Sequence, residues 1–212
     1  NRVLFTNDRL EEYYSEIAGQ WGPFFDDGNG NTTGILGGIR LLRGSANNQI
    51  YNCDIKNAII GLEVDSCVTP GIPTVVLKNT NIENSKIIGL YAPDAAVYAE
   101  NCVFANSGQY NAFMLGGDYS FIHCTFANYW VGNRQTPQIS LRNYYTYKDE
   151  MGITRVNFYD LTDAYFGNCL IYGSREDEIE LDLATGAMSN FRFDNCLIKY
   201  KEYEDLEASD YF

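Results

Sequence analysis

The amino-acid sequence predicts an all-β solenoid, a single-stranded parallel β-helix with about 22 residues and three short strands in each coil. Three observations predict it. A short phrase recurs at regular intervals, apolar residues flank it in fixed columns, and an asparagine stands between those columns. The 212 residues, 1–212, are expected to form one domain, which at this length can bury roughly 70% of its unfolded surface without a metal or disulfide.

The recurring phrase is clearest in "YAENCVFANS", from Tyr98, and "FIHCTFANYW", from Phe121. Six segments align on one column, which holds Cys53, Thr80, Cys102, Cys124, Cys169 and Cys196. The column recurs at intervals of 27, 22, 22, 45 and 27 residues. A period in the low twenties indicates a solenoid in which each copy lies roughly 4.8 Å from the previous one.

The columns beside the cysteine predict a bend. In all six segments, the residue three positions before the cysteine column is apolar, and so is the residue two positions after it. A straight strand has a side-chain period of two, so these positions cannot both point inward unless the chain turns between them. The residue at the turn is Asn52, Asn79, Asn101, His123, Asn168 or Asn195. Asparagine is the non-glycine residue that best tolerates a left-handed backbone, so we expect a strand, a tight corner and a second strand.

A third strand is predicted about ten residues later, in "IIGLEV", "IIGLYA", "AFML" and "EIELDL". A leucine-rich repeat has a similar period, but its leucine pattern and helical segments are missing here. The interval of 45 indicates an insertion over residues 143–166, with a hairpin turn near "KDEMG", so that the coil above Cys124 is interrupted or lacks a cysteine. Residues 26–38, "DDGNGNTTGILGG", are interpreted as a loop before a strand in "IRLL".

The two ends of the solenoid are expected to differ. The charged segment from Lys199 to Asp210 is a plausible cover for the last coil, whereas "NRVLF" at the start reads as a strand with nothing before it. We expect the chain to be a processed or truncated product, the C-terminal part of a longer β-helix, or Val3 to Phe5 to pair with a neighbouring molecule. Cover of that first strand by residues 10–17 would contradict this expectation.

The charge excludes several classes of partner. With 15 basic and 28 acidic residues, the formal net charge is −13. A protein that follows nucleic-acid phosphates needs a basic face, so no nucleic-acid partner is expected. Anionic lipid surfaces and polyanionic sugars are disfavoured unless a divalent cation bridges. No apolar run approaches ~18 residues, so no transmembrane segment is expected.

Four segments carry a resemblance to known proteins: "GQWG", "NQIYNCDIKNAIIGLEV", "GGDYSFIHCTFANYW" and "NCLIYGSREDEIEL". Over about residues 15–200 the chain resembles the right-handed parallel β-helices of the pectate-lyase-like class, and more closely surface lipoproteins of gut anaerobes. The resemblance implies export and a place at the cell surface or in the secreted fraction. It specifies the fold and not an activity. The chain departs from it in the loop of residues 26–38.

Five of the six cysteines stand in the repeat column, so we interpret them as a stack of small buried thiols. Their spacing along the stack exceeds the ~3.8 Å between Cβ atoms that a disulfide prefers. Only the pairs Cys102/Cys124 and Cys169/Cys196 are expected to be neighbours. Cys67 lies off the column, in a loop.

His123 is the only histidine, and its place in the corner column predicts that it turns the chain as asparagine does. The alternative is a general base, or a nucleophilic pair with Cys124. Adjacent residues of a strand face opposite ways, which disfavours that pair.

The resemblance suggests two enzymatic precedents. The paired aspartates, Gly-His-Gly and Arg-x-Lys signatures of polygalacturonase-like hydrolases do not occur. A lyase needs acidic calcium ligands and a basic residue. Asp65, Asp94 and Asp118 lie near predicted strand ends and Arg134 and Arg142 follow, although these can equally be solvated loop charges.

A weak calcium loop is the one cofactor candidate. Asp27, Asn29 and Asn31 alternate as in a calcium-binding loop, but Thr32 replaces the needed glycine and no glutamate follows at the twelfth position. The alternative is an ordinary loop rich in turns.

The best binding candidates are aromatic. Tyr144, Tyr145, Tyr147 and Tyr159 crowd the insertion, and Trp130, Arg134 and Arg142 precede or join it. Their rings either lie exposed for a ligand or seal the side of the solenoid. The resulting hypothesis is a non-catalytic surface module that binds a polysaccharide or a surface protein along one solenoid face. The alternative is a polysaccharide lyase or glycoside hydrolase, which requires converging carboxylates in a cleft.

Overall fold

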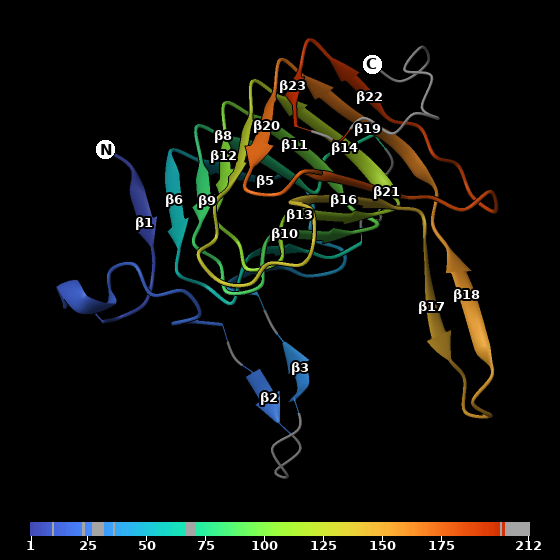
Figure 1. The fold of residues 1–212 in the computed structure, drawn as a ribbon, viewed down its shortest axis with the longest axis horizontal. Helices are drawn as coiled ribbons and strands as arrows, with labels where there is room; N and C mark the ends of the chain where they lie inside the picture. The colour runs from blue at the N-terminus through green and yellow to red at the C-terminus, as the bar shows by residue number, and fades with distance from the viewer. Residues whose placement is uncertain are drawn as a thin grey trace.

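The chain winds repeatedly through three parallel sheets, in the order sheet 3, sheet 1, sheet 2 (Figure 1). The computed structural model describes residues 1–9, 11–22, 24–26, 32–35, 37–66, 71–199 and 201. Sheet 1 contains β1 (Val3–Phe5), β6 (Cys53–Lys56), β9 (Asn81–Glu83), β12 (Val103–Ala105), β15 (Thr125–Asn128), β20 (Leu170–Gly173) and β23 (Leu197–Ile198). Sheet 2 contains β4 (Ile39–Leu41), β7 (Ile60–Val64), β10 (Ile88–Pro93), β13 (Tyr110–Leu115), β16 (Ile139–Arg142) and β21 (Ile179–Asp182). Sheet 3 contains β5 (Asn48–Tyr51), β8 (Val75–Lys78), β11 (Ala96–Glu100), β14 (Gly117–Ile122), β19 (Leu161–Gly167) and β22 (Arg192–Asp194). The predicted all-β parallel β-helix is therefore confirmed.

The corner between sheets 3 and 1 has the predicted left-handed backbone. All six residues of the asparagine column have φ between 50° and 54°. Their amides also form a ladder, because Asn101 donates to Asn79 (2.7 Å) and Asn79 donates to Asn52 (3.1 Å). His123 occupies the same corner with its side chain exposed.

Two further left-handed corners escaped the sequence analysis. Asn57, Asn84 and Asn106, with φ of 63°, 56° and 53°, turn the chain from sheet 1 into sheet 2. Asp94 and Gly116, with φ of 48° and 59°, turn it from sheet 2 into sheet 3. Apart from His123, these left-handed corners carry asparagine, aspartate or glycine, the residues that bear positive φ at least cost.

The cysteine column runs through sheet 1 in the predicted register, with one correction. β15 pairs directly with β20, Phe126 opposite Ile171, so Cys124 and Cys169 are neighbours although 45 residues separate them. The long interval is one enlarged coil, not two coils. Cys53, Cys102, Cys124, Cys169 and Cys196 are free thiols, as predicted, and hydrogen bonding with Cys102 raises the pKa of Cys124. Cys67 lies outside the described residues.

The core consists of side chains stacked from coil to coil. The Phe104 and Phe126 rings lie parallel at 4.9 Å, and Phe166 stacks between Phe121 (5.0 Å) and Phe193 (4.7 Å). Phe104, Phe121, Phe126 and Phe166 are fully buried. These residues are the apolar columns of the repeat, so a regular sequence becomes a continuous core.

Two antiparallel hairpins interrupt the coils and extend from the side of the solenoid where β10 and β13 lie (Figure 1). The first pairs β2 (Phe24–Asp26) with β3 (Thr32–Ile35), where the sequence analysis expected only a loop. The candidate calcium ligands Asp27, Asn29 and Asn31 lie outside the described residues. The second pairs β17 (Tyr144–Lys148) with β18 (Thr154–Phe158) around the predicted turn. The insertion ends earlier than predicted, because β19 belongs to the coil.

β1 pairs with β6 and has no partner on its other edge among the described residues. Val3 and Leu4 are more than half exposed. The 3₁₀ turn η1 (Glu12–Tyr14) and the following residues run along the corner of sheets 1 and 2, where Asn57 and Asn84 donate to the carbonyls of Ser15 and Glu16. In the part of the chain that is described, no helix has the length and apolar character needed to cross a membrane.

Candidate functional site

A groove of about 570 Å³ lies between the second hairpin and the outer face of sheet 2. Residues from four successive coils, and from the hairpin and its base, line it: Arg43, Asp65, Ser66, Tyr91, Pro93, Asp94, Phe113, Leu115, Tyr145 and Tyr159. We call it the hairpin groove. It lies at the carboxyl ends of β7, β10 and β13, where the chain leaves sheet 2 for sheet 3.

The floor of the hairpin groove is a pair of stacked rings on adjacent coils. Leu90 and Ala112 point into the core, so the next residues, Tyr91 and Phe113, point outward. Their centroids are 5.5 Å apart with an interplanar angle of 29°. Tyr110 continues the row, 5.4 Å from Phe113. The strand register thus builds an aromatic surface from residues 19 to 22 positions apart in the sequence.

A second pair of stacked rings comes from the hairpin. Tyr145 and Tyr159 lie 5.8 Å apart at 24°, and the Tyr145 hydroxyl accepts a hydrogen bond from Asn157 (2.8 Å). A two-stranded hairpin is marginal alone, so it needs an anchor. Tyr144 supplies one, because its hydroxyl donates to Asp182 of β21 at 2.6 Å.

Charged groups surround one end of the groove. Burial raises the pKa of the Asp94 carboxyl, and Arg43 opposes this shift. Burial also raises the pKa of Tyr91, with a further contribution from Asp65. The groove therefore combines flat apolar ring faces with carboxylate acceptors and one guanidinium.

The predicted binding residues separate into different environments. Tyr145 and Tyr159 line the hairpin groove, while Tyr147 is 43% exposed beside Tyr145. Tyr144 anchors the hairpin. Arg142 forms ion pairs with Glu180 and Asp182 and lies 5.5 Å over the Phe113 ring, at the border of the aromatic floor.

Arg134 requires a correction. Its side chain is only 3% exposed and pairs with the fully buried Glu178 (2.8 Å). It also donates to the carbonyl of Thr136 (2.7 Å). Arg134 therefore holds the loop before β16 in place and is not available to a surface ligand.

Trp130 lies at a second hollow, of about 250 Å³. Its lining residues are Glu16, Ala18, Asn84, Asn106, Tyr129, Trp130, Val131 and Gly132, and we call it the tryptophan pocket. It is separate from the hairpin groove and lies at the corner through which the chain enters sheet 2.

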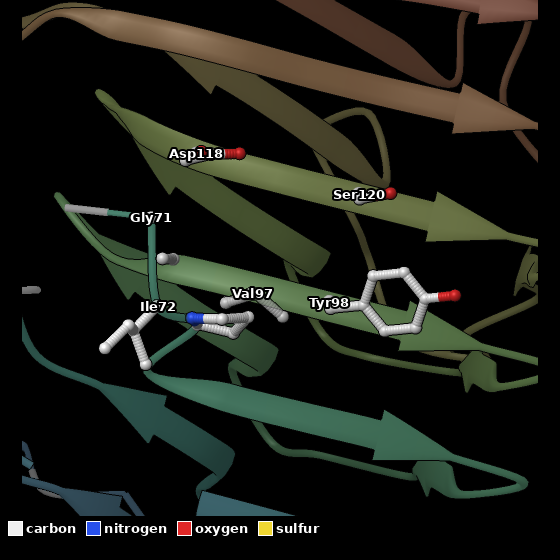
Figure 2. A pocket seen from close by; sticks show the side chains of 8 residues that line it. Gly71, Ile72, Val97, Tyr98, Asp118 and Ser120 are labelled. Atoms are coloured by element: carbon white, nitrogen blue, oxygen red, sulfur yellow. The ribbon is translucent and has the colours of Figure 1, made fainter. Parts of the chain in front are cut away.

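A third hollow, of about 120 Å³, lies on the outer face of sheet 3. Figure 2 shows Val97 and Tyr98 on one strand, Asp118 and Ser120 on the next, and Gly71 and Ile72 on the segment before β8. Asp118 is therefore on a different face from Asp65 and Asp94. The three carboxylates proposed as lyase ligands do not converge, and no group of three or more candidate metal ligands occurs within the described residues.

The sequence analysis missed the floor of the groove. Tyr91 and Phe113 stand at the outward position of the sheet 2 column, where other coils carry Glu63 and Ser140. Aromatic residues at an outward position of a repeat are a usable signal, because nothing in the core requires them there.

Comparison of the chain with protein-family models, with curated proteins and with solved structures finds no match.

Proposed function

We propose that this protein is a non-catalytic module of the cell surface or the secreted fraction, which binds a neutral glycan in the hairpin groove. The observation that carries the proposal is the presence of two stacked aromatic pairs, Tyr91–Phe113 and Tyr145–Tyr159, in one groove with carboxylates at its rim. A pyranose ring offers an apolar face of C–H groups and a rim of hydroxyls. Aromatic rings pack on that face, and carboxylates accept hydrogen bonds from the hydroxyls.

Size and charge define the ligand class. A groove of about 570 Å³ has the volume typical of ligand pockets, roughly 300–1,000 Å³, and this supports a glycan as the occupant. The net charge of −13 and the carboxylates of Asp65 and Asp94 repel uronate chains. A neutral polysaccharide meets both conditions.

The test is a glycan array that includes neutral and uronic-acid polysaccharides, run with and without calcium. We expect retention of a neutral glycan, and Tyr145→Ala or Tyr91→Ala should weaken it roughly ten-fold or more, as is typical when an aromatic residue at the centre of a binding site is truncated. Tyr51→Ala is the matched control, because Tyr51 is a 40% exposed tyrosine of sheet 3 outside the groove. Retention that neither groove substitution weakens would refute the proposal.

Hydrolysis or elimination within the same groove is the second candidate. It is favoured by Asp65 and Asp94, which line the groove from successive coils, and by the raised pKa of Asp94, which suits a general acid. Assays for new reducing ends and for unsaturated products on the retained glycan separate the two functions. Product formation that Asp94→Asn abolishes would establish the enzyme.

A further inference from the structure

We propose that the glycan is an extended chain which crosses the outer face of sheet 2 and occupies the tryptophan pocket as well as the hairpin groove. This inference rests on the proposed function and specifies its ligand as a polysaccharide of several units rather than a mono- or disaccharide.

The two hollows lie at opposite ends of the same strands. The hairpin groove includes Pro93 and Leu115, the last residues of β10 and β13. The tryptophan pocket includes Asn84 and Asn106, the left-handed corners that precede these strands. A strand of six residues spans roughly 20 Å at about 3.3 Å per residue, a length that an oligosaccharide of several units covers.

Between the two hollows, sheet 2 carries an apolar cluster in which Ile88 and Tyr110 are each only 8% exposed. Ile88, Tyr91, Tyr110 and Phe113 pack together outside the main core, on the outer face of sheet 2. The Tyr110 ring lies at the start of β13 and contacts the Phe113 ring, which lines the hairpin groove. A chain that leaves the groove toward the tryptophan pocket therefore has ring surface beneath it at Tyr91 and Phe113, and crosses the largely buried Tyr110 and Ile88 before it reaches the pocket.

Hydrogen bonds hold the loop that lines the tryptophan pocket in place. The amide of Tyr129 donates to the Asn106 side chain (3.1 Å), and the amide of Trp130 donates to the Asn128 side chain (3.1 Å). The indole also packs closely on the backbone of the corner, since a Cβ placed on Gly108 would lie 3.5 Å from Cε2 of Trp130. The buried pair of Arg134 and Glu178 fixes the loop that carries these rings.

The pocket presents the same chemistry as the groove. Tyr129 is 55% exposed beside the indole, and Glu16 adds a carboxylate for hydroxyls, while Asn84 and Asn106 line the pocket with amides that already bond in part to the chain itself. An immobilised aromatic loop loses little conformational entropy on binding, which favours a ligand that stacks on it. The acidic Glu16 again favours a neutral chain.

The experiment is a calorimetric titration with cello-, xylo- and manno-oligosaccharides of two to eight units. For a series that binds, we expect the affinity to rise with length until both hollows are occupied and then to level off. Trp130→Ala should lower the affinity for the longest oligomers roughly ten-fold and leave that for the shortest unchanged, whereas Tyr145→Ala should weaken all lengths. Trp130→Phe keeps an aromatic face and should lose less, and Tyr51→Ala should change nothing.

Three outcomes would overturn the inference. An affinity that is already maximal for two or three units, with Trp130→Ala silent at every length, would leave the hairpin groove as the whole site and the proposed function intact. An equal loss at every length in Trp130→Ala would show an indirect effect on the groove. Failure of all three series to bind, together with no retention of any neutral glycan on the array, would reject both the extended chain and the proposed function.

Discussion

Arg134 and Glu178 form a buried bidentate pair that joins the loop after β15 to the start of β21, with Nη2 to Oε1 at 2.8 Å and Nη1 to Oε2 at 3.0 Å. The backbone amides of Gln138 (3.2 Å) and Arg175 (2.9 Å) also donate to Glu178. One carboxylate thus organises the loop that places Trp130 on the outer surface.

Arg134→Ala should destabilise the protein by roughly 3–5 kcal/mol, because it leaves the Glu178 charge buried and unpaired. Arg142→Ala is the control. Arg142 pairs with Glu180 at a site about 30% exposed on both sides, and its loss should cost less than about 1 kcal/mol. Urea unfolding of both variants measures the difference, and equal costs would mean that the buried pair contributes no more than a surface pair.

Phe126→Ala should cost roughly 3–5 kcal/mol, because it opens a cavity between coils. The ring is fully buried and lies within 6.0 Å of the Phe104, Phe121 and Phe166 rings. Phe158→Ala, at a position 49% exposed on the hairpin, should cost far less by the same unfolding measurement. A small loss in Phe126→Ala would show that neighbouring coils can collapse into the space.

His123→Asn should leave the stability nearly unchanged, since asparagine holds the same corner in five other coils with the same φ. His123→Val should cost roughly 1–2 kcal/mol, because a β-branched residue resists the left-handed region. Thermal unfolding at one pH compares the two. If His123→Asn lost as much as His123→Val, the imidazole would have a role beyond turning the chain.

Asp94→Asn should raise the stability at pH 7 and have no effect below about pH 4, the ordinary range of an aspartate pKa. Burial raises the pKa of Asp94, so between the ordinary and the raised value the folded state binds more protons than the unfolded state. Stability then falls as the pH rises through this window. Asparagine does not ionise, so the variant should not lose this stability. It also suits the positive φ of this position.

Asp149→Asn provides the control of opposite sign. Its hydrogen bond with Arg155 lowers the pKa of Asp149, so the carboxylate contributes stability at neutral pH that is lost as the pH falls. At pH 7, the melting temperature of Asp94→Asn should therefore lie above that of the unmodified protein, and that of Asp149→Asn should lie below it. At pH 3.5, both differences from the unmodified protein should be smaller. The same sign in both would contradict the burial of Asp94.

The coil could be predicted from the sequence because in a solenoid every coil lies on a copy of itself. Columns in the aligned sequence become columns in space, so Cys102, Phe104 and Asn101 already specify a buried thiol, a core ring and a left-handed corner. The local sequence "KDEMG" likewise located the turn of the second hairpin. Such predictions require no knowledge of contacts beyond the next coil.

Which outward-facing residues contact one another could be learned only from the tertiary structure. The sequence analysis did not single out Tyr91 and Phe113, and although the strand period places them outward, the hairpin of Tyr145 must fold against them before a groove exists. Likewise, an interval of 45 residues fits either two coils or one coil with an insertion, and only the pairing of β15 with β20 made Cys124 and Cys169 neighbours. Arg134 and Glu178, 44 positions apart, carry no local signal of their pairing. The repeat determines which residues point inward, whereas the contacts among outward residues arise from insertions whose course the repeat does not encode.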